Sequence, residues 1–151
     1  MRKIGKAIAT LFFAGYFPVA PGTVASIIAV GLYLLVRQHT YLYNFLAVLF
    51  LVLGFWSAGI AKSNFKEKDP PHIVIDEFSA MFASYLFIPF SWKRLIIGFF
   101  LFRLFDIVKI PPLKRLESLP GARGIMLDDI AAAIITNVIL QISVFFPFFS
   151  R

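Results

Sequence analysis

The sequence contains no cysteine, which excludes disulfide bonds, thiolate zinc sites and a cysteine nucleophile. Only two histidines occur, so a histidine-rich metal site is excluded. Membrane phosphatases that form a covalent phosphohistidine need two histidines among Arg and Lys in a recognisable order, which this chain lacks. There is no Gly-x-Ser-x-Gly elbow, P-loop or His-Glu-x-x-His motif. Charged residues make up only 15% of the chain, too few to cover the surface of a soluble domain.

Apolar residues dominate what is present. They account for 60% of the 151 residues, including 19 phenylalanines, and the mean hydropathy is +0.84. The composition predicts an all-α, polytopic integral membrane bundle in one domain over residues 1–151, with about four to five spanning helices and an N-terminal interfacial or re-entrant helix. The predicted spans are residues 20–36, 43–61, 73–90, 95–108 and 125–148.

The net charge of +7 is interpreted as a signal of membrane orientation, not of nucleic-acid binding. If the N-terminus is cytoplasmic and all five segments span, ten basic residues fall on the cytoplasmic side and four on the other. The cytoplasmic set is Arg2, Lys3, Lys6, Lys62, Lys66, Lys68, Lys109, Lys114, Arg115 and Arg123. The opposite set is Arg37, Lys93, Arg94 and Arg151.

Five of the eight carboxylates lie within or at the edge of apolar segments. They are Asp76, Glu77, Asp106, Asp128 and Asp129. Burying an ionised carboxylate costs several kcal/mol unless it is paired, hydrogen-bonded or metal-bound. The predicted topology places all five at one depth on the cytoplasmic side, where they would repel one another without cations, and oxygen ligands suit Mg²⁺, Mn²⁺ or Ca²⁺. Alternatively, acids at helix starts act only as partners of the helix dipole.

Basic and polar residues near these acids are candidates for binding an anion. Arg103 and Asp106 are spaced i, i+3, which fits either a local ion pair or an Arg that binds phosphate while the acid orients it. Lys109 extends the same helix face. Thr23 is predicted to be the N-cap of a helix whose free backbone N–H groups could bind phosphate, or to be a plain cap. His72 is a weaker candidate for donating a proton to a leaving group.

Four sequence blocks carry a resemblance to a known family. They are Gly15-Tyr-Phe-Pro-Val-Ala-Pro-Gly-Thr-Val, Asp69-Pro-Pro-His-Ile-Val-Ile-Asp-Glu, Phe102-Arg-Leu-Phe-Asp-Ile-Val-Lys and Gly124-Ile-Met-Leu-Asp-Asp-Ile. In this order they resemble the phosphatidylglycerophosphatase A family of small bacterial membrane enzymes. The resemblance implies Mg²⁺-dependent removal of the terminal phosphate of phosphatidylglycerophosphate, giving phosphatidylglycerol, at the cytoplasmic face of the bacterial inner membrane.

Together, the resemblance and the residue types suggest roles for the candidate residues. The catalytic set is Asp76, Glu77, Asp128 and Asp129, the Mg²⁺ ligands are drawn from Asp76, Asp106, Asp128 and Asp129, and the phosphate-binding set is Arg103, Lys109 and Thr23. Direct attack by water and a phospho-aspartyl intermediate both remain open. The expected partners are a phospholipid substrate and the bilayer, without nucleic acid, and the sequence makes no prediction of oligomeric state.

Two other functions fit part of the same evidence. The first is a phosphatase for another lipid phosphate, such as phosphatidic acid or a polyprenyl phosphate. The second is a small divalent-cation channel or carrier lined by the acids. Transport sites usually lie near the membrane midplane between repeated halves, whereas these acids gather at one face beside Arg103 and no internal repeat is visible.

Overall fold

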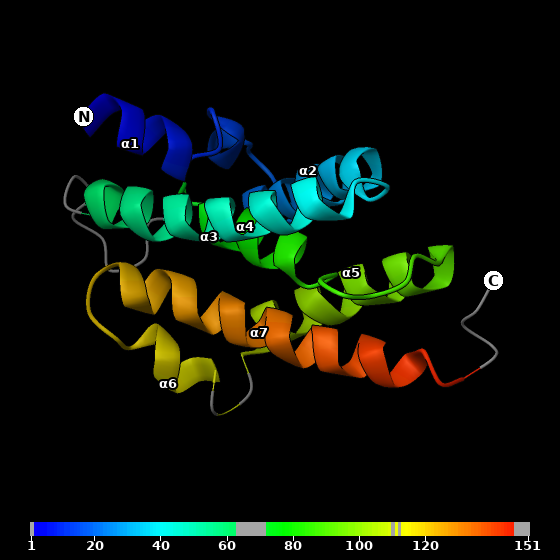
Figure 1. The fold of residues 1–151 in the computed structure, drawn as a ribbon. Coiled ribbons are helices and arrows are strands. Elements are labelled where there is room, and N and C mark those ends of the chain that lie inside the picture. The colour runs from blue at the N-terminus through cyan, green and yellow to red at the C-terminus, as the bar shows by residue number, and fades with distance from the viewer. Residues whose placement is uncertain (1, 63–71, 110, 112, 147–151) are drawn as a thin grey trace.

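A computed structural model describes residues 2–62, 72–109, 111 and 113–146 of the chain. Within these residues there are seven α-helices, one short 3₁₀-helix and no strand, so the predicted all-α class is confirmed (Figure 1). The elements in order are α1 (Arg2–Ala9), η1 (Ala14–Tyr16), α2 (Pro21–Val36), α3 (Thr40–Lys62), α4 (Ile75–Ala83), α5 (Trp92–Val108), α6 (Leu113–Glu117) and α7 (Ala122–Ser143).

The short helix α4 lies at the centre of the bundle. It packs against α2, α3 and α7, while α5 packs against α7 and α1 lies along α3 (Figure 1). Seven of the nine residues of α4 are buried, including Phe78, Met81 and Phe82. Because its N-terminal turn is buried together with the start of α2, the end of α5 and the start of α7, residues from four helices meet at one end of the bundle.

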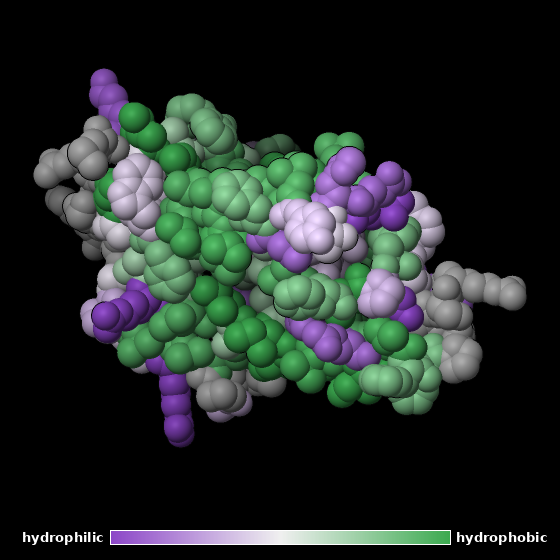
Figure 2. Space-filling view, in the orientation of Figure 1, coloured by the Kyte–Doolittle hydropathy of each residue, from purple (hydrophilic) through white to green (hydrophobic). Residues whose placement is uncertain are grey.

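Two helices are long and apolar enough to cross a membrane by length and composition. They are Thr40–Ala61, with mean hydropathy 2.0, and Ala122–Ser143, with mean hydropathy 1.7. The predicted spans 20–36 and 95–108 correspond to α2 and α5, which are shorter at 16 and 17 residues. Figure 2 shows apolar side chains across the face over α3 and α7, with hydrophilic residues gathered toward the two ends, as expected for a bundle that contacts lipid.

The prediction that residues 73–90 form one spanning helix is wrong. Helix α4 ends at Ala83 and is followed by turns, and nine residues of α-helix measure only about 14 Å, which cannot cross a hydrocarbon core of about 30 Å. The Asn137 side chain of α7 binds the turn where α4 ends, since its Nδ2 donates hydrogen bonds to the carbonyls of Ser84 and Leu86 at 2.9 and 2.8 Å. Helix propensity cannot reveal this, because the side chain comes from a distant segment.

Tyrosine side chains hold the same region in place. The Tyr43 hydroxyl donates to the Phe82 carbonyl at 2.8 Å, and the Tyr85 hydroxyl donates to the Leu95 carbonyl at 2.7 Å. Tyr33 stacks on Tyr85, with 4.8 Å between ring centroids. The last carbonyls of a helix have no partner within the helix, and the Tyr43 hydroxyl supplies one for Phe82 at the end of α4.

Replacing Asn137 by Leu should therefore destabilise the protein. The substitution leaves the carbonyls of Ser84 and Leu86 without their donor, and we expect a loss of about 2–3 kcal/mol, seen as a lower melting temperature in detergent micelles. Gln141→Leu is the control, because Gln141 is exposed and donates only to Asn137 Oδ1. If the Asn137→Leu and Gln141→Leu proteins have the same melting temperature, Asn137 does not stabilise the end of α4.

Candidate active site

A cavity of about 260 Å³ lies where α2 and α4 begin, α5 ends and α7 begins. It contains all five acids singled out from the sequence, together with two cationic side chains. The lining residues are Ala20, Pro21, Gly22, Ile73, Asp76, Glu77, Arg103, Asp106, Lys109, Gly124, Ile125, Asp128 and Asp129. The cavity is therefore strongly polar, although the bundle around it is apolar.

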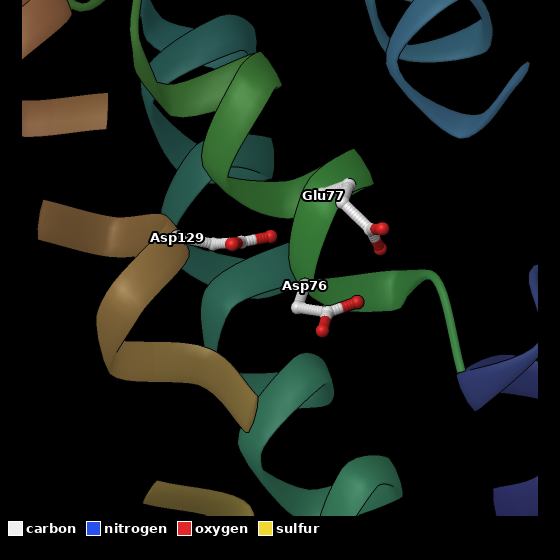
Figure 3. A group of neighbouring side chains, drawn as sticks. All are labelled: Asp76, Glu77 and Asp129. Carbon is white, nitrogen blue, oxygen red and sulfur yellow. The ribbon is translucent and has the colours of Figure 1, made fainter. Parts of the chain in front are cut away.

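Three of the acids form a compact group, which we call the three-acid group. Asp76 and Glu77 come from the first turn of α4 and Asp129 comes from α7 (Figure 3). One carboxylate oxygen from each lies within 4.8 Å of the others. Asp76 and Asp129 are only 8% and 3% exposed, and Glu77 is half-buried.

The three-acid group fits a divalent cation. Among the residues that the structure describes, Asp76 Oδ1, Glu77 Oε2 and Asp129 Oδ2 have no hydrogen-bond partner. Buried carboxylates this close repel one another, and the dipole at the start of α4 compensates only part of that charge. A hard cation that prefers oxygen ligands would relieve the repulsion and occupy the unpartnered oxygens.

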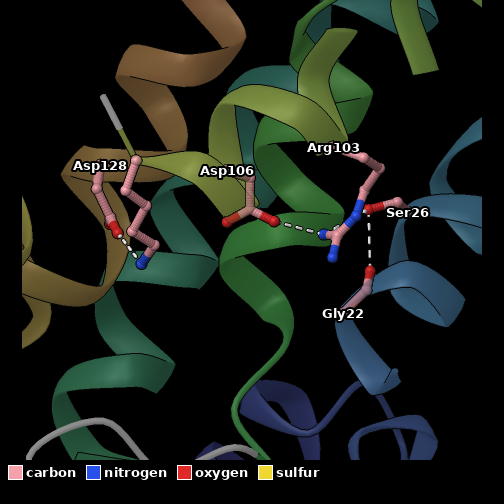
Figure 4. Close-up of polar contacts among 6 residues, drawn as sticks. Gly22, Ser26, Arg103, Asp106 and Asp128 are labelled. Carbon is pink, nitrogen blue, oxygen red and sulfur yellow. Dashed lines mark hydrogen bonds and ion pairs between the residues drawn. The ribbon is translucent and has the colours of Figure 1, made fainter. Parts of the chain in front are cut away.

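Arg103 provides positive charge within the same cavity. It forms an ion pair with Asp106, and its Nη1 lies 3.5 Å from Ser26 Oγ, which donates to the Gly22 carbonyl at 2.9 Å (Figure 4). Arg103 Nε is buried and has no hydrogen-bond partner within the described part of the chain. The guanidinium is thus oriented by Asp106 and retains a donor for an anion.

Lys109 provides the second positive charge. Its Nζ donates to Asp128 Oδ2 at 2.7 Å and lies 3.6 Å from Glu117 Oε1. Burial alone would lower the pKa of the Lys109 ammonium, but the hydrogen bond to Asp128 and the negative charges of Asp128, Asp129 and Glu117 outweigh burial and raise that pKa. Lys109 is therefore charged at neutral pH.

The structure groups the predicted metal ligands differently from the sequence analysis. Asp76 and Asp129 belong to the three-acid group, but Asp106 is paired with Arg103 and Asp128 with Lys109. Glu77, which the sequence analysis placed only in the catalytic set, takes the third position. Adjacent helix residues point about 100° apart, so the sequence alone could not decide which acid of each pair faces the other helix.

The prediction that Thr23 is an N-cap is wrong. Helix α2 begins at Pro21 with Ala20 as its N-cap, because proline suits the first helical position with its fixed φ and missing N–H. Thr23 lies two residues further on, and its backbone N–H donates to the Ala20 carbonyl at 2.9 Å. This amide is already bonded, and Thr23 is not among the described residues that line the cavity.

His72 contributes to the loop before α4. Its ring stacks on Tyr16 with 4.4 Å between centroids, and its Nδ1 lies 3.2 Å from the Gly15 carbonyl. A Cβ at Gly15 would lie 2.1 Å from the His72 carbonyl oxygen, so a glycine is needed where the two segments meet. This arrangement supports an anchoring role for His72 at the loop.

Gly22 is a site residue that the sequence analysis missed. A Cβ at this position would lie 2.1 Å from Glu77 Oε1 and 3.4 Å from Arg103 Nη1. The start of α2 can approach Glu77 this closely only because residue 22 has no side chain. The Pro-Gly-Thr sequence marked the helix start, but nothing in it indicated contact with an acid on α4.

Comparison with known proteins decides the family. Residues 7–144 match the family model described as Phosphatidylglycerophosphatase A. The chain belongs to this family. Members named Phosphatidylglycerophosphatase A from Escherichia coli and Haemophilus influenzae are 31% and 32% identical to it, each over 88% of this chain and over 79% and 84% of their own lengths.

Another relative of this protein has a name that specifies a different lipid. The Bacteroides thetaiotaomicron protein named "Putative phosphatidylinositol-3-phosphatase" is 35% identical over 90% of this chain and 91% of its own length. No solved structure matches the chain. Family membership makes the protein a lipid phosphatase and the acid-lined cavity its candidate active site.

The close approach of Gly22 to Glu77 gives a direct test of the three-acid group. Gly22→Ala should displace the Glu77 carboxylate and weaken divalent-cation binding by roughly ten- to a hundredfold, as loss of ligand positioning does at other metal sites. The measurement is a Mg²⁺ titration of the purified protein by isothermal calorimetry.

Gly31→Ala in the same helix is the matched control, since nothing lies within 4 Å of a Cβ there. Its cation affinity should equal that of the unmodified protein. Equal affinities for both variants would show that Glu77 does not contribute to cation binding.

Proposed function

We propose that this protein is a Mg²⁺-dependent lipid phosphatase that hydrolyses the terminal phosphomonoester of phosphatidylglycerophosphate and gives phosphatidylglycerol. The observation that carries the proposal is the three-acid group, with its unpartnered oxygens, which shares one cavity with Arg103 in an apolar bundle. Carboxylates alone suit a cation, but a guanidinium beside them suits an anion bound with that cation. The names of two relatives support the choice of lipid.

Asp76, Glu77 and Asp129 are the residues that would hold Mg²⁺. Few protein ligands, with the remaining positions available to water and phosphate, suit Mg²⁺ better than an all-protein cage does. When bound, the cation neutralises phosphate charge and lowers the pKa of water for attack.

Arg103 and Lys109 are assigned to the phosphate itself. Arg103 is fixed by its ion pair with Asp106 and has Nε available to donate to a phosphate oxygen. Lys109 contributes a permanent positive charge from the end of α5. The ion pairs with Asp106 and Asp128 hold the Arg103 and Lys109 side chains in place. Negative charge that develops on the phosphoryl group would therefore be stabilised without rearrangement of these side chains.

Asp128 is assigned as the proton acceptor. Its Oδ2 is held by Lys109, while its buried Oδ1 has no hydrogen-bond partner among the described residues. As the water oxygen bonds to phosphorus and the phosphorus–oxygen bond to the lipid glycerol breaks, the proton of the water passes to Asp128 Oδ1. The departing glycerol oxygen takes a proton from solvent, which gives inorganic phosphate and the lipid alcohol.

The cavity is placed at the cytoplasmic face of the bacterial inner membrane. In this proposal α2, α3, α5 and α7 cross the bilayer, and residues 75–91 cross it as α4 followed by turns. Helices α2 and α5 measure about 24 and 25 Å, so local thinning of the bilayer would accommodate them. The excess of basic residues on the side of the cavity supports this orientation.

An assay of the purified protein against a panel of lipids tests the proposed substrate. The panel consists of phosphatidylglycerophosphate, phosphatidic acid, phosphatidylinositol 3-phosphate and a polyprenyl phosphate in mixed micelles. We expect phosphate release to require Mg²⁺, to stop with EDTA, and to show a kcat/KM for phosphatidylglycerophosphate roughly tenfold or more above the others. A higher kcat/KM for phosphatidylinositol 3-phosphate would instead assign the activity in the name of the Bacteroides relative.

Two isosteric variants separate metal binding from proton transfer. Asp76→Asn should raise the Mg²⁺ concentration needed for half-maximal activity by roughly ten- to a hundredfold. Asp128→Asn should lower kcat by about 10²–10⁴-fold while leaving Mg²⁺ affinity near that of the unmodified protein, because Asp128 lies outside the three-acid group. Full activity of the Asp128→Asn variant would contradict the role of Asp128 as proton acceptor. An unchanged Mg²⁺ dependence of the Asp76→Asn variant would contradict the proposed metal site.

A further inference from the structure

An apolar groove of about 220 Å³ runs between α2 and α5, separate from the acid-lined cavity. All of its lining side chains are apolar: Ile27 and Val30 from α2, and Leu95, Ile96, Phe99 and Phe100 from α5. Ile27, Ile96 and Phe100 are 56%, 54% and 65% exposed, so the groove is open at the side of the bundle. In a membrane this side faces hydrocarbon chains.

The groove and the acid-lined cavity lie along one seam between the same two helices. On α2, Gly22 lines the cavity and Val30 lines the groove, with Ser26 midway at four-residue spacing, so the three share one helix face. On α5, Arg103 lines the cavity and Phe99 lines the groove, again four residues apart. The contact of Arg103 Nη1 with Ser26 Oγ crosses the seam between them.

The groove therefore starts about one helical turn, roughly 5–6 Å, beyond Arg103 on the side away from the acids. A molecule that occupies both places must have a phosphate at one end, hydrocarbon chains at the other and a polar link between them. Phosphatidylglycerophosphate has this construction, because its terminal phosphate is joined through glycerol and a phosphodiester to the glycerol that carries the acyl chains.

We propose that the α2–α5 groove binds an acyl chain of the lipid whose phosphate enters the acid-lined cavity. This rests on the proposed function, since it assumes that the substrate is a lipid phosphomonoester. Arg103 stands between the cavity and the groove, where the polar link of the lipid would pass it before the chain continues along Phe99 and Val30. The groove thus selects for the presence and length of the chain, and the cavity selects for the headgroup.

A second apolar cavity, of about 320 Å³, lies among α3, α4 and α7 but fits this role less well. The helix faces that lead to it from the three-acid group pass through Ala80 and Ala133, which are 0% and 5% exposed. Both alanines are buried along that route, and no Lys or Arg is among the described residues that line the second cavity. The α2–α5 seam, by contrast, has Arg103 at its polar end and exposed residues along its length.

A matched pair of tryptophan substitutions tests the proposal. Ile27→Trp fills the α2–α5 groove, and Ile134→Trp fills the second cavity from a residue of the same type that is 58% exposed. Each variant is assayed in mixed micelles with long-chain phosphatidylglycerophosphate and with a short-chain, water-soluble analogue of the same headgroup. Ile27→Trp should raise KM for the long-chain lipid by roughly tenfold, equivalent to the loss of a few buried methylene contacts, and should leave the short-chain kcat/KM within about twofold.

Ile134→Trp should match the unmodified protein with both lipids. The groove proposal is overturned if Ile27→Trp behaves like Ile134→Trp, if it impairs both lipids equally, or if Ile134→Trp is the variant that raises KM for the long chain. Release of phosphate from neither lipid by the unmodified protein would instead reject the proposed function.

Photolabelling gives a measurement that does not depend on turnover. A long-chain phosphatidic acid with a diazirine partway along one chain, bound to the unmodified protein and irradiated, should label residues 95–100 or 27–30. Ile27→Trp should reduce this labelling, and Ile134→Trp should not. Labelling confined to α3 or α7 would overturn the proposal even if the headgroup preference proves different.

Discussion

Carboxylates buried at one end of an apolar bundle require positive charge around them, and the architecture of the site follows from this requirement. Asp106 is satisfied by Arg103 and Asp128 by Lys109, both from α5. The three-acid group has no ion pair among the described residues, and its unpartnered oxygens leave a place for a divalent cation. A cation held there would share one cavity with the Arg103 guanidinium, an arrangement suited to binding a phosphate.

The position of the site in the bundle depends on how α4 is held. The helix brings its two acids to one end of the bundle, and at its other end Tyr43 binds the Phe82 carbonyl while Asn137 binds the carbonyls of Ser84 and Leu86. These contacts fix α4 along its axis against α3 and α7. Polar contacts at one end of α4 therefore help to position the acids at its other end.

Much of this arrangement could be predicted from the sequence. Apolar runs located α2, α3, α5 and α7, and the expectation that the five acids lie close together is matched by the one cavity that they line. The end of α4 could not be predicted, because Asn137 lies 53 residues beyond Ser84. Nor could the choice of Glu77 as the third acid, since it depends on how closely Gly22 approaches from another helix.

Lys109 has φ 44° and ψ 57°, a left-handed backbone conformation that residues other than glycine adopt only at a cost in free energy. Glycine would end α5 there without strain, as it does in many helices, but it has no ammonium to present to Asp128. Residue 109 is thus a position where the best amino acid for folding and the best one for the site differ. Stability gained by placing glycine there would be accompanied by loss of the charge, a trade-off between stability and activity at a single residue.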